Sequence, residues 1–84
     1  MSDKSNEWVY ARYREAHARA KNRAGPGGWV LLSRELRVAL VSHEVLAVIA
    51  SQEEDVTGVS VGGLAAARNR MIKLAHLGVL GDEP

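Results

Sequence analysis

The sequence contains no cysteine, no phenylalanine and only two prolines among its 84 residues. Without cysteine, no disulfide and no thiolate-bound metal can stabilise the fold, and this suits the reducing cytoplasm in which we expect the protein. No apolar run approaches the roughly 18 residues that a membrane helix needs, and the polar residues 1–7 predict no signal peptide. A chain this short makes a single domain, residues 1–84, with a thin core.

Charge is unevenly distributed along the chain, although the formal net charge is only +1. Residues 12–37 contain seven basic and two acidic side chains, whereas residues 44–55 contain four acidic and no basic ones. Residues 68–73 carry three basic side chains and no acidic one. Local positive fields attract polyanions more strongly than the net charge indicates, so we expect an anionic macromolecule as the partner.

An apolar stripe predicts an N-terminal helix over residues 5–24, after a flexible tail at 1–4. The Gly-Pro-Gly-Gly turn at residues 25–28 ends this helix. The stripe has the helical spacings of three and four positions and consists of Val9, Tyr13, Ala16, Ala20 and Ala24.

Residues 29–80 are predicted to add three more helices, with at most short strands near 29–32, 59–61 and 79–80; residues 29–32 fit a short strand or the lead-in to a helix equally well. Ser33 and Ser42 are expected to cap helices over about 34–40 and 43–52, and the second of these is apolar enough to be the buried centre. The last helix is expected from about Leu64 to Leu77, with Gly78 as its stop. Its buried stripe is predicted to be Leu64, Ala67, Met71, Leu74 and Leu77. Residues 81–84 are expected to form a flexible tail.

The segments WVLLSREL, SHEVLAVIA, VSVGGLAA and RMIKLAHLGVL occur in this order between residues 28 and 80. This order resembles the winged-helix domains of bacterial transcription regulators and of plasmid or phage replication proteins. The resemblance implies a mainly α, helix-turn-helix-like core over residues 28–80, whose last helix reads DNA. Two departures are visible: Leu64 to Gly78 spans only 14 positions, and four residues follow Leu80, which leaves little length for a second helix or a wing hairpin.

Two groups of polar residues are candidate DNA contacts. Arg68, Asn69, Arg70 and Lys73 lie on the last predicted helix, where Arg and Lys can bind phosphates or guanine and Asn can bind adenine. Arg12, Arg19 and Arg23 share one face of the first helix, and such a row can follow a phosphate backbone. For both groups the alternative is an ordinary solvated helix face.

The remaining candidates point away from cofactors and catalysis. The stripe of Val9, Tyr13, Ala16 and Ala20 can close-pack on a partner helix, and we expect it to be a homodimer interface. Trp8 and Trp29 are expected in the core. His17, His43 and His76 lack a metal-ligand spacing, the Gly-rich turn lacks the GK[ST] ending of a phosphate loop, and Glu53 to Asp55 is expected to be a solvated acidic loop.

These patterns predict a small, sequence-specific DNA-binding protein that is not an enzyme. By resemblance it is a dimeric transcriptional repressor of plasmid or phage type, which reads the major groove of double-stranded DNA with its last helix. We expect no metal, no small-molecule cofactor and no membrane association. The alternative is a helical protein–protein interaction module, an adaptor or anti-regulator, that grips its partner through the Val9/Tyr13/Ala face. The observation that separates the two is whether both basic groups lie on one continuous surface.

Overall fold

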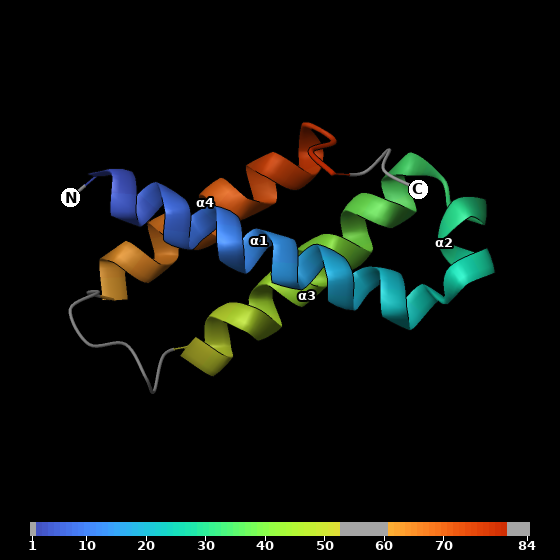
Figure 1. Cartoon of the computed structure of the whole chain (residues 1–84), viewed down its shortest axis with the longest axis horizontal. Coiled ribbons are helices and arrows are strands. Elements are labelled where there is room, and N and C mark those ends of the chain that lie inside the picture. Colours follow the sequence, from blue (N-terminus) through green and yellow to red (C-terminus); the bar gives the residue numbers. More distant parts are fainter. Residues whose placement is uncertain (1, 53–60, 81–84) are drawn as a thin grey trace.

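The computed structural model describes residues 2–52 and 61–80, and in this part of the chain it contains four helices and no strand. They are α1 (Ser2–Ala24), α2 (Pro26–Leu31), α3 (Arg34–Gln52) and α4 (Val61–His76). Helix α1 crosses in front of the antiparallel pair α3 and α4, and the short α2 joins α1 to α3 at one end (Figure 1). The prediction of a mainly α fold is confirmed. None of the described helices combines the length and the apolar character that crossing a bilayer requires.

The core lies where α1 meets the other three helices. Val9, Tyr13, Ala16 and Ala20 of the predicted stripe of α1 are buried there, and Ala24 is half-buried. Trp29 is confirmed as a core residue, while Trp8 is half-buried and packs against the core. Helices α3 and α4 each contribute one face. The buried apolar residues from these two helices are Val41, Val45, Val48, Ile49, Ala67, Met71 and Ala75.

Of the two structures open for residues 29–32, the helix is the one observed, because residues 29–31 belong to α2. Pro26 occupies the first turn, where its fixed φ favours a helix and its missing N–H costs nothing. The Trp29 N–H donates to the carbonyl of Gly25 over 3.0 Å, which closes a helical turn. Only Leu32 is extended, with φ −73° and ψ 142°.

Helix α3 is one continuous rod, so the predicted break at Ser42 is wrong. Ser33 does cap the helix, since its Oγ accepts a hydrogen bond of 3.3 Å from the N–H of Leu36. Ser42 lies inside α3, where the buried stripe of Val41 and Val45 runs past it without interruption. Burial of a continuous stripe outweighs a local capping preference. The second half of α3 is also less buried than predicted, because Leu46 is 49% exposed.

Helix α4 ends as the sequence predicts but is followed by a turn and not by a strand. The N–H of Gly78 donates to the carbonyl of Ala75 and the N–H of Val79 to that of Leu74, over 3.0 and 3.1 Å. With Gly78 at φ 79°, this is a Schellman motif. The strand expected at residues 79–80 is therefore wrong, and Leu77, expected to be buried, is 64% exposed.

The remaining boundaries differ slightly from those predicted. Helix α1 begins at Ser2, so residues 2–4, expected as part of a flexible tail, are helical. Val61 is the first residue of α4 and so is not in the strand expected near residues 59–61. Residues 1, 59–60 and 81–84, for which a strand or tails were predicted, lie outside the described residues.

We predict that Gly78→Ala lowers the free energy of unfolding by about 1–2 kcal/mol, the cost of a left-handed backbone for an L-residue. Space is not the cause, because an added Cβ would meet only Arg34 Nη2, at an ordinary 3.9 Å. Urea unfolding measures the change. Gly27→Ala is the control: it has no positive φ and nothing within 4 Å of an added Cβ, and should stabilise by about 0.4–1 kcal/mol. Equal effects of the two substitutions would contradict the conformational argument.

Candidate functional site

The outward face of α4 is exposed and carries no negative charge. Helix α4 contains no Asp or Glu, and Asn69, Arg70, Lys73 and His76 are all exposed. Arg68 is half-buried, and its Nη2 donates to Oδ1 of Asn69 over 3.4 Å. Because two positions along an α-helix turn through about 200°, Arg68 and Arg70 face opposite flanks. The four predicted contact residues on α4 therefore do not converge on one point.

Arg70 and Lys73 lie beside the N-terminal half of α1. They line a shallow hollow together with Tyr10, Leu74 and Leu77. Of the apolar residues, Tyr10 is 41% exposed and Leu77 is 64% exposed. Two cations thus border an exposed apolar strip between α1 and α4.

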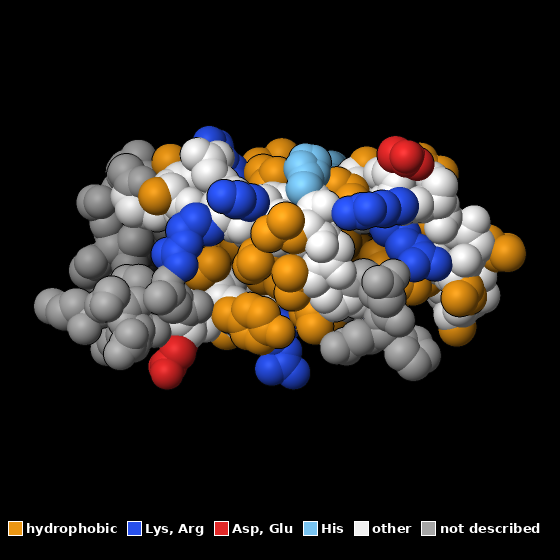
Figure 2. All heavy atoms as spheres, turned by 90° about the horizontal axis from the view of Figure 1, so that it is seen from above, with side chains coloured by type: hydrophobic (Ala, Val, Ile, Leu, Met, Phe, Trp, Pro, Cys, Tyr) orange, Lys and Arg blue, Asp and Glu red, His pale blue; other side chains and the backbone are white. Residues whose placement is uncertain are grey.

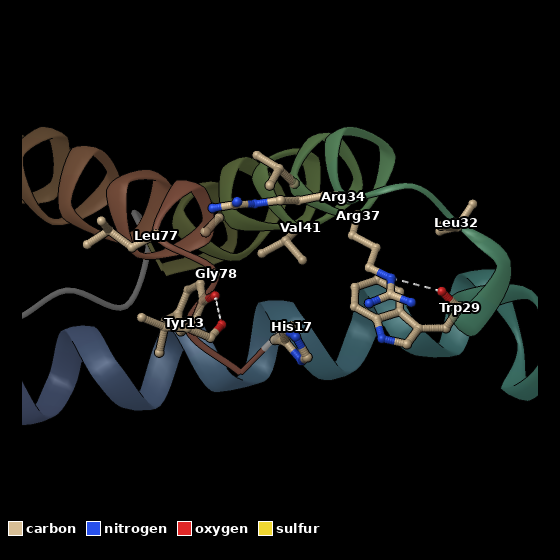
Figure 3. Close-up of a pocket in the computed structure, with 12 residues that line it drawn as sticks. Tyr13, His17, Trp29, Leu32, Arg34, Arg37, Val41, Leu77 and Gly78 are labelled. Atoms are coloured by element: carbon tan, nitrogen blue, oxygen red, sulfur yellow. Dashed lines mark hydrogen bonds between the residues drawn. The ribbon is translucent and has the colours of Figure 1, made fainter. Parts of the chain in front are cut away.

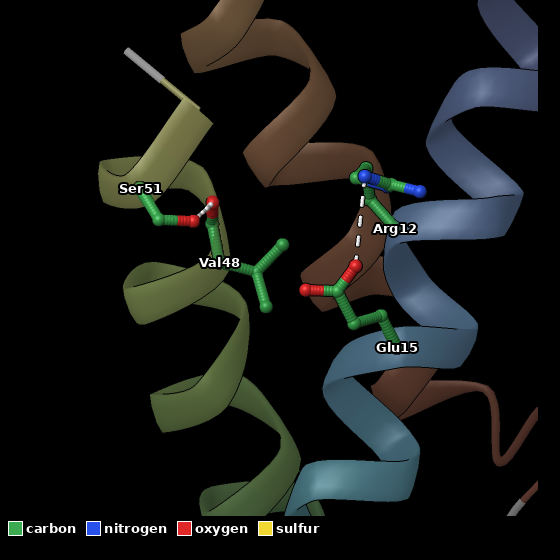
Figure 4. A network of polar contacts seen from close by, with 4 residues as sticks. All are labelled: Arg12, Glu15, Val48 and Ser51. Atoms are coloured by element: carbon green, nitrogen blue, oxygen red, sulfur yellow. Dashed lines mark hydrogen bonds and ion pairs between the residues drawn. The ribbon is translucent and has the colours of Figure 1, made fainter. Parts of the chain in front are cut away.

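The three arginines of α1 face a different flank, towards α3. Nε of Arg23 lies 2.6 Å from Oε2 of Glu44 on α3, in a charge contact that lacks the alignment of a hydrogen bond. Nη1 of Arg12 lies 3.5 Å from Oε1 of Glu15 (Figure 4), and Arg19 is exposed. Two of the three cations are therefore already paired with carboxylates of the same molecule.

The two predicted basic groups do not form a single surface. Arg12 follows Tyr10 by two positions, which places these side chains about 160° apart around α1. Tyr10 lines the hollow that holds Arg70 and Lys73, so Arg12 faces away from that hollow. Arg12 lies on the side opposite the hollow, paired with Glu15 (Figure 4). On α3, the hydroxyl of Ser51 donates to the carbonyl of Val48 in its own helix (Figure 4).

The structure brings in two cations that were not predicted as site residues, both from the first turn of α3. Nη2 of Arg34 donates to the carbonyl of His76 over 3.0 Å, and so caps the C-terminal end of α4. Arg37 does the same for α2: its Nε and Nη2 donate to the carbonyls of Trp29 and Val30 over 3.0 and 3.1 Å. Its guanidinium also lies 5.4 Å from the centre of the Trp29 ring. The only sequence signal was their spacing of three positions at the start of a helix.

Leu77 separates these two arginines from the two cations of α4. It lines the hollow with Arg70 and Lys73, and it also lines a cleft with Arg34 and Arg37. Figure 2 shows this side of the molecule, with Lys and Arg side chains on both sides of a central hydrophobic group. We call the four cations Arg34, Arg37, Arg70 and Lys73, with Leu77 between them, the basic face.

The cleft on the α3 side of Leu77, which we call the Trp29 cleft, has a volume of about 400 Å³ and an aromatic floor (Figure 3). The His17 ring packs edge-on to Trp29 at 5.2 Å between centroids and lies 6.2 Å from Tyr13. The hydroxyl of Tyr13 donates to the carbonyl of Val79. Burial, with a smaller effect of Tyr10, raises the pKa of Tyr13 to about 12.

The stripe expected to form a dimer interface is not available to a second copy. Val9, Tyr13, Ala16 and Ala20 are at most 5% exposed, because they form the molecule's own core. In a chain this small, the apolar face of the longest helix is needed to make a core at all. The prediction of this interface is therefore wrong.

Comparison with known proteins finds no family model, no curated protein and no solved structure that matches this chain. The winged-helix relationship stays a prediction. Within the described residues, no three His, Asp or Glu side chains converge in a way that could hold a metal ion. The basic face and the Trp29 cleft are the features of the described residues that bear on function.

We predict that Tyr13 makes the fold lose stability at alkaline pH. Its pKa is about 12 in the folded chain against an ordinary value of 10.0. The stability that comes from the raised pKa of Tyr13 is thus complete below pH 10. It is lost as the pH rises to about 12, by about 1.4 kcal/mol per pH unit. Urea unfolding at pH 8 and pH 11 measures the loss. Tyr13→Phe should be about 1 kcal/mol less stable than the parent protein at pH 8, because it lacks the hydrogen bond. Between pH 8 and pH 11, its free energy of unfolding should fall less than that of the parent protein. Tyr10→Phe removes the smaller electrostatic cause and leaves the burial of Tyr13 in place, so it should lose only slightly less than the parent protein.

We predict that the two halves of the Arg23–Glu44 pair are not equivalent. The Glu44 side chain is 2% exposed and that of Arg23 is 63% exposed. Arg23→Gln leaves a buried carboxylate without its cation and should cost about 1–2 kcal/mol, less than for a fully buried pair because water reaches the arginine. Glu44→Gln removes the buried charge and should change stability by less than about 1 kcal/mol. Thermal unfolding compares them, with Arg12→Gln as a surface-pair control; a Glu44→Gln loss as large as that of Arg23→Gln contradicts this account.

Proposed function

We propose that this protein binds double-stranded DNA through its basic face, with the outward stripe of α4 in the major groove. The two predicted basic groups lie on separate surfaces, so the proposal rests on the charge of this face alone: four cations around Leu77, from a helix without acidic residues and from the first turn of α3, where Glu35 is the acidic residue. A major groove about 12 Å wide admits one α-helix. Asn69, Arg70 and Lys73 then face the bases and the nearest phosphates.

The local charge around α4 supports a polyanionic partner. The whole chain carries eleven Lys and Arg against ten Asp and Glu, but α4 contains no acidic residue, and Glu15 and Glu44 are already paired. Arg34 and Arg37 each donate to backbone carbonyls, which leaves their positive charge in place. They therefore add a positive field beside α4 that steers and holds phosphates.

As a repressor, the protein would bind an inverted repeat as a homodimer, by analogy with the family that the sequence resembles. Such a dimer needs a surface other than the stripe of α1. Exposed apolar side chains at the corner of α2 and α3, namely Val30, Leu31 and Leu36, are 67%, 87% and 56% exposed. The same corner favours a second candidate function, a protein–protein interaction module.

The DNA proposal predicts a steep loss of affinity with salt. In fluorescence anisotropy with a random duplex, the logarithm of affinity should fall linearly with the logarithm of salt concentration, by about 0.9 for each phosphate contact. Lys73→Gln should reduce this slope by about 1, and Arg70→Gln should weaken binding by about tenfold. Arg19→Gln removes the same charge from the other flank of α1 and should leave both quantities unchanged.

Circular dichroism of each variant verifies that the helices are intact. A protein that fails to bind duplex DNA even at low salt is not a DNA-binding protein, and the interaction module then becomes the better assignment. If Arg19→Gln weakens binding as much as Arg70→Gln, attraction is spread over the whole molecule and the basic face is not the site.

A further inference from the structure

The Trp29 cleft has an aromatic and apolar lining that binding to DNA does not use. Its floor is the row of Tyr13, His17 and Trp29, and the opposite wall, formed by α3 and the end of α4, includes Val41 and Leu77 (Figure 3). A cleft of about 400 Å³ falls in the range of about 300–1,000 Å³ typical of small-molecule sites. Its walls favour an apolar or aromatic body.

The charged groups at this cleft are all positive. Arg34 and Arg37 line it, and no Asp or Glu is among the described residues that do. Arg34 reaches from α3 towards Leu77 and Gly78, along the side of the cleft opposite Tyr13 and His17 (Figure 3). One of its N–H groups is held by the carbonyl of His76. A guanidinium has five N–H donors, so Arg34 retains donors for a second acceptor.

We propose that the Trp29 cleft binds a small amphipathic carboxylate. The apolar body of this ligand lies on the aromatic floor, and its carboxylate accepts hydrogen bonds from Arg34, whose planar fork matches a carboxylate. The site does not depend on DNA binding, because its ligand is a small molecule and it is tested without DNA.

The two halves of the cleft exclude simpler ligands. A bare inorganic anion would leave the apolar part of the cleft unfilled and gain nothing from contact with its walls. An uncharged apolar molecule would fill that part but leave the guanidinium of Arg34 without a new partner, and a cation would be repelled by Arg34 and Arg37. Only a molecule with both an apolar body and a negative group is complementary to the whole cleft.

Isothermal titration of the full chain with 3-phenylpropionate tests the proposal. This probe carries one ring and one carboxylate, and it should bind with a dissociation constant below about 1 mM. Its neutral amide, 3-phenylpropanamide, should bind about tenfold more weakly, as expected for loss of a charge-assisted hydrogen bond. The cationic 3-phenylpropylamine should not bind. No heat with 3-phenylpropionate, or equal affinity for the amine, overturns the proposal.

Variants locate the site. Arg34→Gln removes the positive charge and should weaken binding of 3-phenylpropionate by about tenfold, with circular dichroism to verify that the helices stay intact. Val38→Trp fills the cleft from a half-buried position and should abolish binding. Arg19→Gln, on the other flank of α1, is the matched charge control and should have no effect. An unchanged affinity in Arg34→Gln overturns the assignment. An acidic, Phe-containing peptide that binds more than about 100-fold tighter than 3-phenylpropionate also overturns it, because that result points to a protein partner.

Discussion

The burial of one face of α1 is the constraint on which the rest of the structure depends. Ala16 and Ala20 have no exposed surface, and side chains this small let neighbouring helices approach closely. The same helix contacts α2, α3 and α4, so its stripe is the common wall of the core. A short chain without disulfides has no second apolar face of this size that could bind a partner. The surfaces left for the proposed recognition therefore lie outside this stripe, on α2, α3 and α4.

The features predicted correctly from the sequence are those that local chemistry decides. Ser33 caps α3 through its own hydroxyl, and Gly78 ends α4 because it accepts a positive φ. The wrong predictions concern segments whose local signals fitted two structures, or whose local signals were outweighed by packing. Four apolar residues after a glycine-rich turn fit a strand or a helix equally well, and Pro26 decided for the helix. At Ser42, the buried stripe of α3 outweighed a capping residue.

The candidate site was only half predictable for a different reason. Arg70 and Lys73 could be found from the composition of one helix, but their neighbours depend on how the helices are rotated and where they end. Arg34 joins the site because the C-terminal end of α4 lies against the first turn of α3, 42 residues earlier in the chain. Glu44 shows the converse, since a carboxylate at a core position pairs with Arg23 and takes that cation out of the predicted group. Neither pairing has a signature in the linear sequence.

The hydrogen bond from Tyr13 to the carbonyl of Val79 joins residues 66 positions apart. Contacts of such long sequence separation form after most of the intervening chain is ordered, because closing the loop between them costs entropy. Final closure of the core therefore waits until α4 and the turn after it are in place, and a chain cut before Val79 leaves the phenol of Tyr13 without this acceptor.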